Sequence, residues 1–235
     1  MRNYFILDGV DSRDFGVYIS GQGTFSAPAR SYDMISIPGR SGDLYKDNNR
    51  LENGVFTYPA FICRNFKSNI ESLRAFLLSL RGYKVLTDSY DTEKFRQVVF
   101  EGDFDPDVTA KNDAASFDIS FNAKPQRFLN SGQQTTTLTA SGTITNPTRY
   151  DAQPLLRVYG TGTFYVGSVA VTISAANTYT DIDCEMMDAF KGTQNRNAFV
   201  SVSGYKFPVL APGANGITLG TGITRIIVTP RFWTV

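Results

Sequence analysis

The sequence predicts a mainly β protein with two domains, an α+β domain with one packed helix followed by a β-sandwich or barrel. Its 235 residues fit two domains of about 100–130 residues better than one. The chain has 18 Phe and 12 Tyr but only 19% charged residues, a composition that argues against disorder and favours β structure. Only one segment has the periodicity of a long helix.

That segment reads FKSNIESLRAFLLSLRGYK. Ser68 can cap the start, and Glu71 stands at the reciprocal capping-box position. Gly82 occupies the place of a C-cap glycine, and Arg81 lies in the last turn. We expect a helix over about 68–81 that packs one apolar stripe against a sheet. The stripe consists of Phe66, Ile70, Leu73, Phe76, Leu77 and Leu80.

The clearest strand of the first domain is SFDISFNAK, where Phe117, Ile119 and Phe121 alternate with polar residues. This strand should bury one face and expose the other. Further strands are expected at YFIL, SYDMISI, VFTYPAFI and RQVVFEG. Together with the helix they predict an α+β domain over residues 1–130.

The composition changes around residues 126–134, where charge thins out and Thr, Ser and Gly take over. Residues 131–235 contain short strand-like runs separated by glycine or asparagine turns, a pattern typical of a β-sandwich or barrel. The expected strands are TTTLTA, LLRVYG, TFYVG, VAVTIS, TYTDID, FPVLAPG, ITLG and ITRIIVTPRF.

The sequence contains few of the residue types that catalytic and metal-binding sites use. The chain has no histidine, which removes the commonest general base and metal ligand and excludes Ser-His-Asp and Cys-His sites. Its two cysteines, Cys63 and Cys184, are far apart in sequence and cannot supply a zinc cluster. We expect both to be buried free thiols rather than a disulfide.

One acidic run resembles the start of a calcium loop. Asp103, Asp105 and Asp107 stand at alternate positions in EGDFDPDVTAKND. The pattern then departs from the calcium motif, because Val108 replaces the glycine and Ala114 replaces the closing glutamate. A solvated turn between strands is the better interpretation.

Two further small-ligand chemistries are conceivable. A glycosidase needs two carboxyl groups about 5–10 Å apart, and DIDCEMMDAF is rich in them, although acidic residues are also common where a strand ends. A sugar could stack on Trp233, the sole tryptophan, yet an end-strand Trp is more often a core residue. The carboxylates concerned are Asp181, Asp183, Glu185 and Asp188.

Charge and hydropathy argue against a nucleic-acid-binding, a secreted or a membrane-spanning protein. The net charge is +1 and basic residues are scattered singly, so no stripe marks a nucleic-acid-binding face. The N-terminal apolar run is four residues long, whereas a secretory signal needs about 7–15. No apolar run approaches the ~20 residues that span a bilayer. We expect production in the cytoplasm and no membrane insertion.

The stretch ISIPGRSGDL combines two glycines, a proline and an Arg/Asp pair. It lacks the lysine and spacing of a phosphate-binding loop. Arg40 and Asp43 could pair across a turn, and Asn53-Gly54 is a strong turn signal, so residues 37–54 predict a long exposed hairpin or turn. Such an arm is costly to order alone and is expected to lie on a neighbouring subunit. The candidate interface residues are Ile37, Pro38, Gly39, Arg40, Ser41, Gly42, Asp43 and Leu44.

Four segments in this order resemble the distal tail protein family of long-tailed, non-contractile bacteriophages. They are SIPGRSGDL, the helix after it, SFDISFNAKPQRFLNSG and GTITNPTRYDAQPLLRVYGTGTF. The resemblance covers nearly the whole chain, and the length matches the plain two-domain members without inserted carbohydrate-binding modules.

The resemblance implies a ring-forming, or belt, N-terminal domain and a galectin-like C-terminal sandwich. Members form hexameric rings, alone or two back to back, that join the tail tube protein to the tail-tip hub protein, with receptor-binding proteins as further partners. DNA passes through the lumen without specific binding. The resemblance therefore implies a virion component at the tail tip, assembled in the host cytoplasm, without cofactor or enzymatic activity.

Two other functions stay open from the sequence. The sandwich could be a carbohydrate-binding module that attaches the virion to host cell-wall sugars. A carboxylate pair could make the chain a wall-degrading glycosidase. A fold alone does not decide between them, because one fold hosts many functions.

Overall fold

The structure is a computed structural model that describes residues 2–20, 26–109, 113–175 and 178–235. The chain divides into two compact units, Met1–Arg127 and Phe128–Thr234. Both are built mainly from antiparallel β-sheets, which confirms the predicted mainly β fold class. The first unit also contains the one α-helix found in the described residues.

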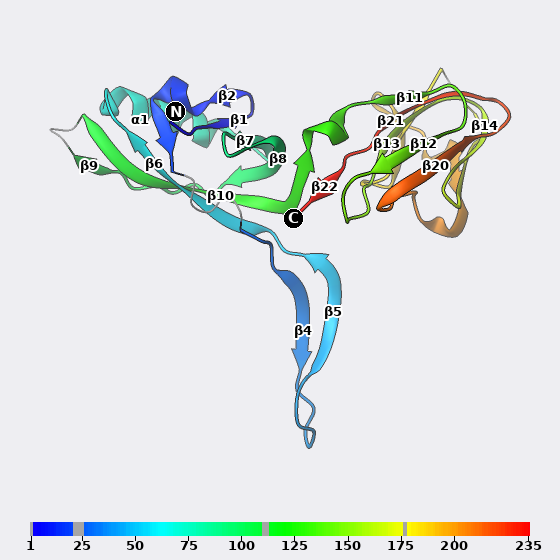
Figure 1. The fold of residues 1–235 in the computed structure, drawn as a ribbon, viewed down its shortest axis with the longest axis horizontal. Coiled ribbons are helices and arrows are strands. Elements are labelled where there is room, and N and C mark those ends of the chain that lie inside the picture. The colour runs from blue at the N-terminus through cyan, green and yellow to red at the C-terminus, as the bar shows by residue number, and fades with distance from the viewer. Residues whose placement is uncertain (1, 21–25, 110–112, 176–177) are drawn as a thin grey trace. The chain divides into compact units, whose positions relative to one another are not determined.

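The first unit is built on a large antiparallel sheet with the strand order β2-β1-β7-β8-β10-β6-β3, and β9 also pairs with β10 (Figure 1). The long strand β10 pairs with β6 over nine consecutive residues, so these two strands form the backbone of the unit. The strands are β1 (Phe5–Leu7), β2 (Val10–Asp11), β3 (Val17–Ile19), β6 (Gly54–Ile62), β7 (Lys84–Asp88), β8 (Asp91–Phe100), β9 (Asp107–Thr109) and β10 (Ala114–Leu129).

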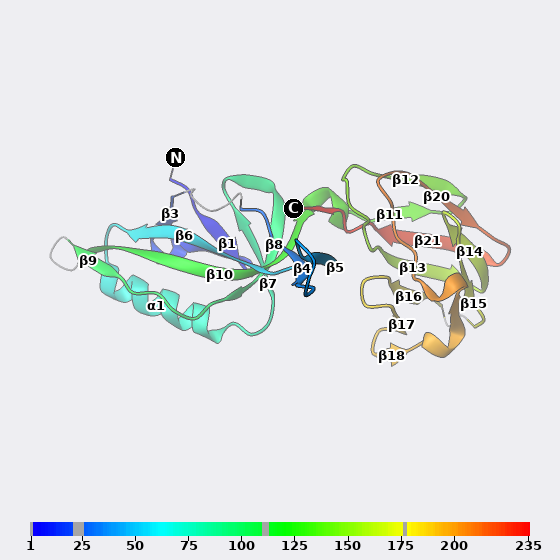
Figure 2. The same ribbon diagram turned by 90° about the horizontal axis from the view of Figure 1, so that it is seen from below.

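The helix α1 (Phe66–Ser79) lies along this sheet (Figure 2). Its apolar stripe packs in one core with the alternate residues Phe117, Ile119 and Phe121 of β10. Of the six predicted stripe residues, four are buried and two, Phe76 and Leu80, are partly buried. Fully burying a side chain of this size contributes about 1.5–3 kcal/mol. The predicted alternation of β10 is therefore confirmed, and it fixes which face of the sheet receives the helix.

The predicted helix start was wrong by two residues. The N-cap is Asn65, in the left-handed region at φ 53°, and the Ser68 hydroxyl donates to its carbonyl instead of capping the helix. The helix ends at Ser79, before Gly82, whose φ is 68°. The Arg81 guanidinium donates to the carbonyls of Leu78 and Leu80, which satisfies acceptors at the helix end.

Strands β4 (Arg30–Ile35) and β5 (Leu44–Leu51) form a separate two-stranded sheet, which we call the arm. Figure 1 shows the arm extending away from the large sheet of its own unit. At its base, the Asn53 amide donates to the hydroxyl of Tyr83 and the side-chain oxygen of Asn122. These bonds tie the end of the arm to the sheet from which it leaves.

The second unit is a sandwich of a six-stranded and a five-stranded sheet. Its core combines Val158 and Ile226 of the first sheet with Phe164 and Ile217 of the second. The six-stranded sheet has the order β11 (Thr136–Leu138), β21 (Ile223–Thr229), β13 (Leu155–Gly160), β16 (Thr180–Asp183), β17 (Asp188–Lys191) and β18 (Gln194–Asn195). The five-stranded sheet has the order β12 (Gly142–Asn146), β20 (Gly213–Leu219), β14 (Gly162–Val166), β15 (Val169–Ile173) and β19 (Val200–Val202).

Short elements complete the chain. The 3-10 turns are η1 (Ser12–Phe15), η2 (Asn130–Gln133), η3 (Asn197–Phe199) and η4 (Ser203–Tyr205), and the last strand is β22 (Trp233–Thr234). The expected strand at FPVLAPG does not form; within it, Leu210 makes only an isolated bridge with Ala152. Its two prolines remove ladder donors, and this explains why no strand develops.

The C-terminal segment differs from prediction in which aromatic residue is buried. Phe232 is the core residue, whereas Trp233 is half-buried, stacks on Tyr150 at 4.5 Å and donates its indole N–H to the Asp151 carbonyl. Gly132 lies against Phe232 so closely that a Cβ there would be 2.4 Å from the Phe232 nitrogen. A glycine is therefore required at residue 132.

Both cysteines are free thiols, in agreement with the predicted absence of a disulfide. Cys184 is buried, and burial raises its pKa to about 12, so it is inert at neutral pH. Cys63 is exposed, which contradicts the expectation that both would be buried. It follows the last residue of β6, where the chain leaves the sheet.

Candidate assembly surface

The arm exposes apolar side chains on both faces. On one face Met34 lies opposite Tyr45, and the Tyr32 ring contacts the Tyr45 ring at a centroid distance of 5.2 Å. On the other face Ile35 lies opposite Leu44. These five side chains are 43–57% exposed, although each is large and apolar. The arm therefore presents apolar surface with no core of its own.

Only weak forces within the arm oppose its fraying. Its ion pairs are Arg30–Asp47 at 2.6 Å and Lys46–Asp33 at 3.6 Å, and all four side chains are at least 30% exposed. Such surface pairs contribute about 0–1 kcal/mol each. An isolated two-stranded hairpin is marginally stable at best in water. Contact with another molecule would supply the burial that the arm lacks.

The eight predicted interface residues form the tip of the arm. Ser36 to Asp43 make the loop between β4 and β5, and Leu44 begins β5. The Arg40 amide donates to the Ile37 carbonyl at 3.1 Å, and Gly39 adopts φ 79°, which favours glycine. An exposed hairpin is thus present, but it spans Arg30 to Leu51 rather than residues 37–54, and Gly54 begins β6. Whether its tip is an interface stays a prediction.

The expected contact between Arg40 and Asp43 is absent, since among the described residues no ion pair joins them. Both side chains are exposed at the tip. The loop holds its shape through backbone conformation instead, with positive φ at Gly39 and Gly42. The two charges are therefore free to interact with another molecule.

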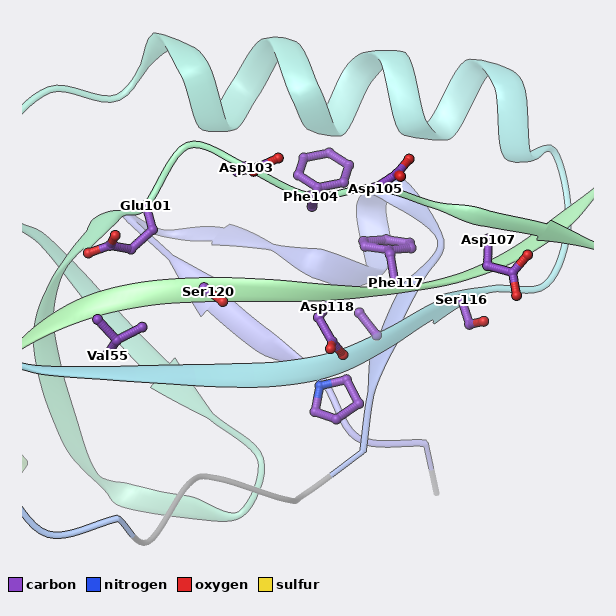
Figure 3. Close-up of a pocket in the computed structure, with 12 residues that line it drawn as sticks. Val55, Glu101, Asp103, Phe104, Asp105, Asp107, Ser116, Phe117, Asp118 and Ser120 are labelled. Atoms are coloured by element: carbon purple, nitrogen blue, oxygen red, sulfur yellow. The ribbon is translucent and has the colours of Figure 1, made fainter.

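A second surface feature is an open groove of about 860 Å³ over strand β10 (Figure 3). Between β8 and β9 the chain moves away from β10, and Phe104 turns back to contact the Phe117 ring at 5.3 Å. The groove is acidic, and no lysine or arginine stands among the described residues that line it. Its carboxylates are Glu101, Asp103, Asp105, Asp107 and Asp118.

The acidic run 103–107 thus gathers at one groove, joined by Asp118 from β10. Within the described part of the chain, no group of three potential ligands is placed to hold a metal ion. The run connects β8 to β9, as the interpretation of a turn between strands requires. The sequence does not predict that Asp118 belongs to this acidic group, because only the pairing of strands in the folded sheet brings Asp118 close to residues 103–107.

In the second acidic stretch, Asp181 and Asp183 are each paired with an arginine. Asp181 accepts two hydrogen bonds from Arg157, and Asp183 accepts two from Arg231. Burial raises the pKa of Asp183, but Arg231 and two backbone N–H groups lower it more, so the net pKa lies below its usual value. Asp181 and Asp183 therefore both take part in arginine pairs that connect separate segments of the sandwich.

Comparisons with known proteins were informative only at the level of structure. No protein-family model matches the chain, and no curated protein matches it. No helix in the described residues is long and apolar enough to cross a membrane.

Solved structures give a clear likeness. The chain has the fold of phage hub and baseplate proteins. It is similar to the Dit protein (gp 19.1) of phage SPP1, described as a paradigm of the hub adsorption apparatus in phages that infect Gram-positive bacteria. The TM-score is 0.76 at 16% identity, covering 97% of this chain and 98% of that one.

Two structures of the phage P2 baseplate in its activated conformation are also similar. The chain in the calcium form has a TM-score of 0.53 at 11% identity, covering 97% of this chain and 98% of that one. The chain in the strontium form has a TM-score of 0.52 at 11% identity, with coverages of 96% and 97%. The resemblance drawn from the sequence is thereby confirmed for the fold.

Sequence reasoning placed the candidate surface at the tip and missed the apolar flanks of the arm. Tyr32 and Met34 lie in the expected strand SYDMISI, and Tyr45 lies in the expected hairpin or turn 37–54. The alternation of Tyr32 and Met34 in SYDMISI suggests a half-buried strand, yet the structure leaves both faces exposed. The signal that could have found them is the polar run KDNNR, which fills most of the partner strand and leaves few apolar residues to build a core.

Proposed function

We propose that the protein is a structural subunit of a phage tail tip. Copies assemble into a hexameric ring that joins the tail tube to the tail-tip hub and host-adhesion apparatus, with DNA passing through its lumen. The N-terminal domain, residues 1–130, forms the ring, and the galectin-like sandwich, residues 131–235, lies outside it. The role is non-enzymatic, and the chain functions in the virion after assembly in the host cytoplasm.

The observation that carries this proposal is the whole-chain likeness to the SPP1 hub protein, since 97% of the chain aligns across both units. The arm gives an independent physical reason for assembly. It exposes large apolar side chains on both faces, and their burial against another copy would offset the cost of ordering the arm. A contact between unlike surfaces closes into a ring when its rotation closes.

The test is the native mass of the purified full-length chain, together with negative-stain images. We expect a particle of six times 26.0 kDa, or twelve times for two rings, with a visible lumen. Persistence of a 26.0 kDa species at every concentration would sink the proposal.

Variants of the arm locate the contact. Replacing Met34 and Tyr45 by serine removes apolar surface that assembly should bury, at a cost of about 1–2 kcal/mol per side chain. The two losses together, about 2–4 kcal/mol, should therefore raise the dissociation constant of the ring by about 30-fold to 900-fold in mass photometry. The matched control changes Met186 and Tyr165, a methionine and a tyrosine that the second unit exposes, to serine as well. Equal loss of ring in both variants would refute a specific role for the arm.

The tip is tested separately by Arg40→Ala with Asp43→Ala. Because both charges are exposed and unpaired with each other, their removal should leave the folding of the chain unchanged. A shift of mass toward smaller species in light scattering would show that the tip contacts a neighbour. An unchanged ring would count against the interface at 37–44 and leave the arm flanks as the contact.

A further inference from the structure

The outer face of the six-stranded sheet carries a strip of cations and tyrosines, which we call the cationic strip. It crosses four adjacent strands and consists of Arg225 on β21, Arg157 and Tyr159 on β13, Tyr179 just before β16, and Lys191 on β17. Arg225 lies directly opposite Tyr159 in the strand register. The neighbours Leu156 and Val158 point into the core, so alternation places Arg157 and Tyr159 on the outside. Lys191 joins the strip through its ammonium group, which reaches the Tyr179 ring.

Aromatic rings hold the cations of the strip in place. The Arg225 guanidinium lies 3.9 Å from the centre of the Tyr159 ring, and the Arg157 guanidinium lies 4.4 Å from that of Tyr179. The Lys191 ammonium is 5.3 Å from the Tyr179 ring, and the two tyrosine rings are 5.9 Å apart. A guanidinium laid flat on a ring keeps its N–H edges available to oxyanions.

The charges of the strip are not balanced. Asp181 is paired with Arg157 and is itself buried, at 4% side-chain exposure. Among the described residues the Arg225 guanidinium makes no ion pair or hydrogen bond, and the Lys191 ammonium donates only to the Thr178 hydroxyl, at 3.5 Å. The next acidic group on this face, Asp183, is held by Arg231. Two fixed cations therefore lack a carboxylate partner.

We propose that the cationic strip binds an anionic polymer whose repeating phosphodiester groups meet Arg225, Lys191 and the free edge of Arg157. Guanidinium and ammonium groups form their strongest hydrogen bonds with such oxyanions. Adjacent strands lie about 4.8 Å apart, so a strip across four strands suits a chain of repeated charges better than one ion. The polymer is expected at the cell surface, an expectation that rests on the proposed tail-tip function.

The experiment measures binding of the full-length chain to linear polyphosphate by biolayer interferometry. Arg225→Gln with Lys191→Gln should weaken binding by about tenfold or more, because each lost charge-assisted contact is of that order. Tyr159→Leu keeps every charge but removes the support of Arg225, and should weaken binding severalfold. The control Arg149→Gln with Lys206→Gln removes the same charge from exposed positions of the same unit and should change binding by less than twofold.

The comparison probes are inorganic phosphate alone, polyglutamate and neutral dextran. Much weaker binding of all three than of polyphosphate supports the proposal. If polyglutamate binds as tightly as polyphosphate, the partner is an acidic protein and the proposal is overturned. If inorganic phosphate binds as tightly per charge as polyphosphate, the strip is a single-ion site and the proposal is likewise overturned. Equal weakening by the control pair would also overturn it. Native mass recorded on the same samples separates the outcomes, since loss of binding with an intact ring leaves the tail-tip proposal standing.

Discussion

Two hairpins of this chain are built alike and supported differently. In the sandwich, β14 and β15 pair from Gly162↔Ile173 to Val166↔Val169 around a two-residue turn. Each of these strands has a further partner, β20 or β19, and the pair buries Phe164, Val166, Val171 and Ile173. The arm, β4 and β5, has no further partner strand among the described residues and exposes its apolar residues.

The difference shows that strand pairing alone does not make a hairpin part of a stable domain. Net stabilisation from one hydrogen bond is about 1 kcal/mol, while ordering one residue costs about as much. The sandwich hairpin is stabilised by apolar burial beneath it. The arm has the same antiparallel strand pairing but, within the described residues, no apolar core beneath it. Its exposed apolar residues therefore contribute little to folding, and we expect them to act in assembly.

The largest effect should come from the core beneath the sandwich hairpin. Phe164→Ala removes a fully buried ring and should lower the free energy of unfolding by about 3–5 kcal/mol. Tyr45→Ala in the arm should change it by less than about 0.5 kcal/mol in the dissociated chain, because Tyr45 is half exposed. Urea unfolding followed by fluorescence measures both. A large loss for Tyr45→Ala would mean that the arm is part of a folding core.

The next effect concerns carboxylates paired with arginine. Asp183→Asn leaves Arg231 without its bidentate partner and should cost about 3 kcal/mol, since Asp183 is almost fully buried. Asp47→Asn breaks the Arg30 pair in the arm and should cost less than about 1 kcal/mol, because that pair is exposed. Comparing the urea midpoints of both variants at pH 7 checks the contrast. Equal costs would contradict it.

The Asp183 pair should also depend on pH. Since the pKa of Asp183 is lower in the folded chain than the unfolded value of about 3.9, its stabilisation is present above that pH. It is lost as the pH falls through the lower, folded pKa. The difference in unfolding free energy between wild type and Asp183→Asn should therefore shrink below pH 4. A constant difference down to pH 2 would exclude this linkage.

The smallest expected effect on stability comes from replacing a glycine in the turn of each hairpin. Gly167 in the sandwich hairpin has φ 57° and Gly39 in the arm has φ 79°, and a Cβ at either would meet no atom within 4 Å. Alanine at each therefore costs only backbone strain, about 1–2 kcal/mol. Gly167→Ala should lower the melting temperature of the second unit, whereas Gly39→Ala should leave melting unchanged and loosen only the tip. Amide hydrogen exchange distinguishes the two, and equal melting shifts would contradict the difference.

Local patterns in the sequence determined the elements whose burial is regular. The stripe of α1 and the alternation of β10 are readable because a helix and a half-buried strand each repeat with a fixed period. The absence of histidine also excludes, by composition alone, every catalytic site that depends on an imidazole. The N-cap of the helix could not be predicted from the sequence, because Asn65 occupies that position without a side-chain hydrogen bond to the helix.

Only the tertiary structure decided which surfaces stay open. The arm, the acidic groove beside Asp118 and the cationic strip all depend on which strand lies next to which, and pairings between distant residues leave no mark in local periodicity. Arg225 meets Tyr159, a residue far away along the chain, only because β21 and β13 are neighbours in the sheet. The sequence by itself determined which segments could form strands and a helix, while long-range packing decided which of their side chains were left facing solvent.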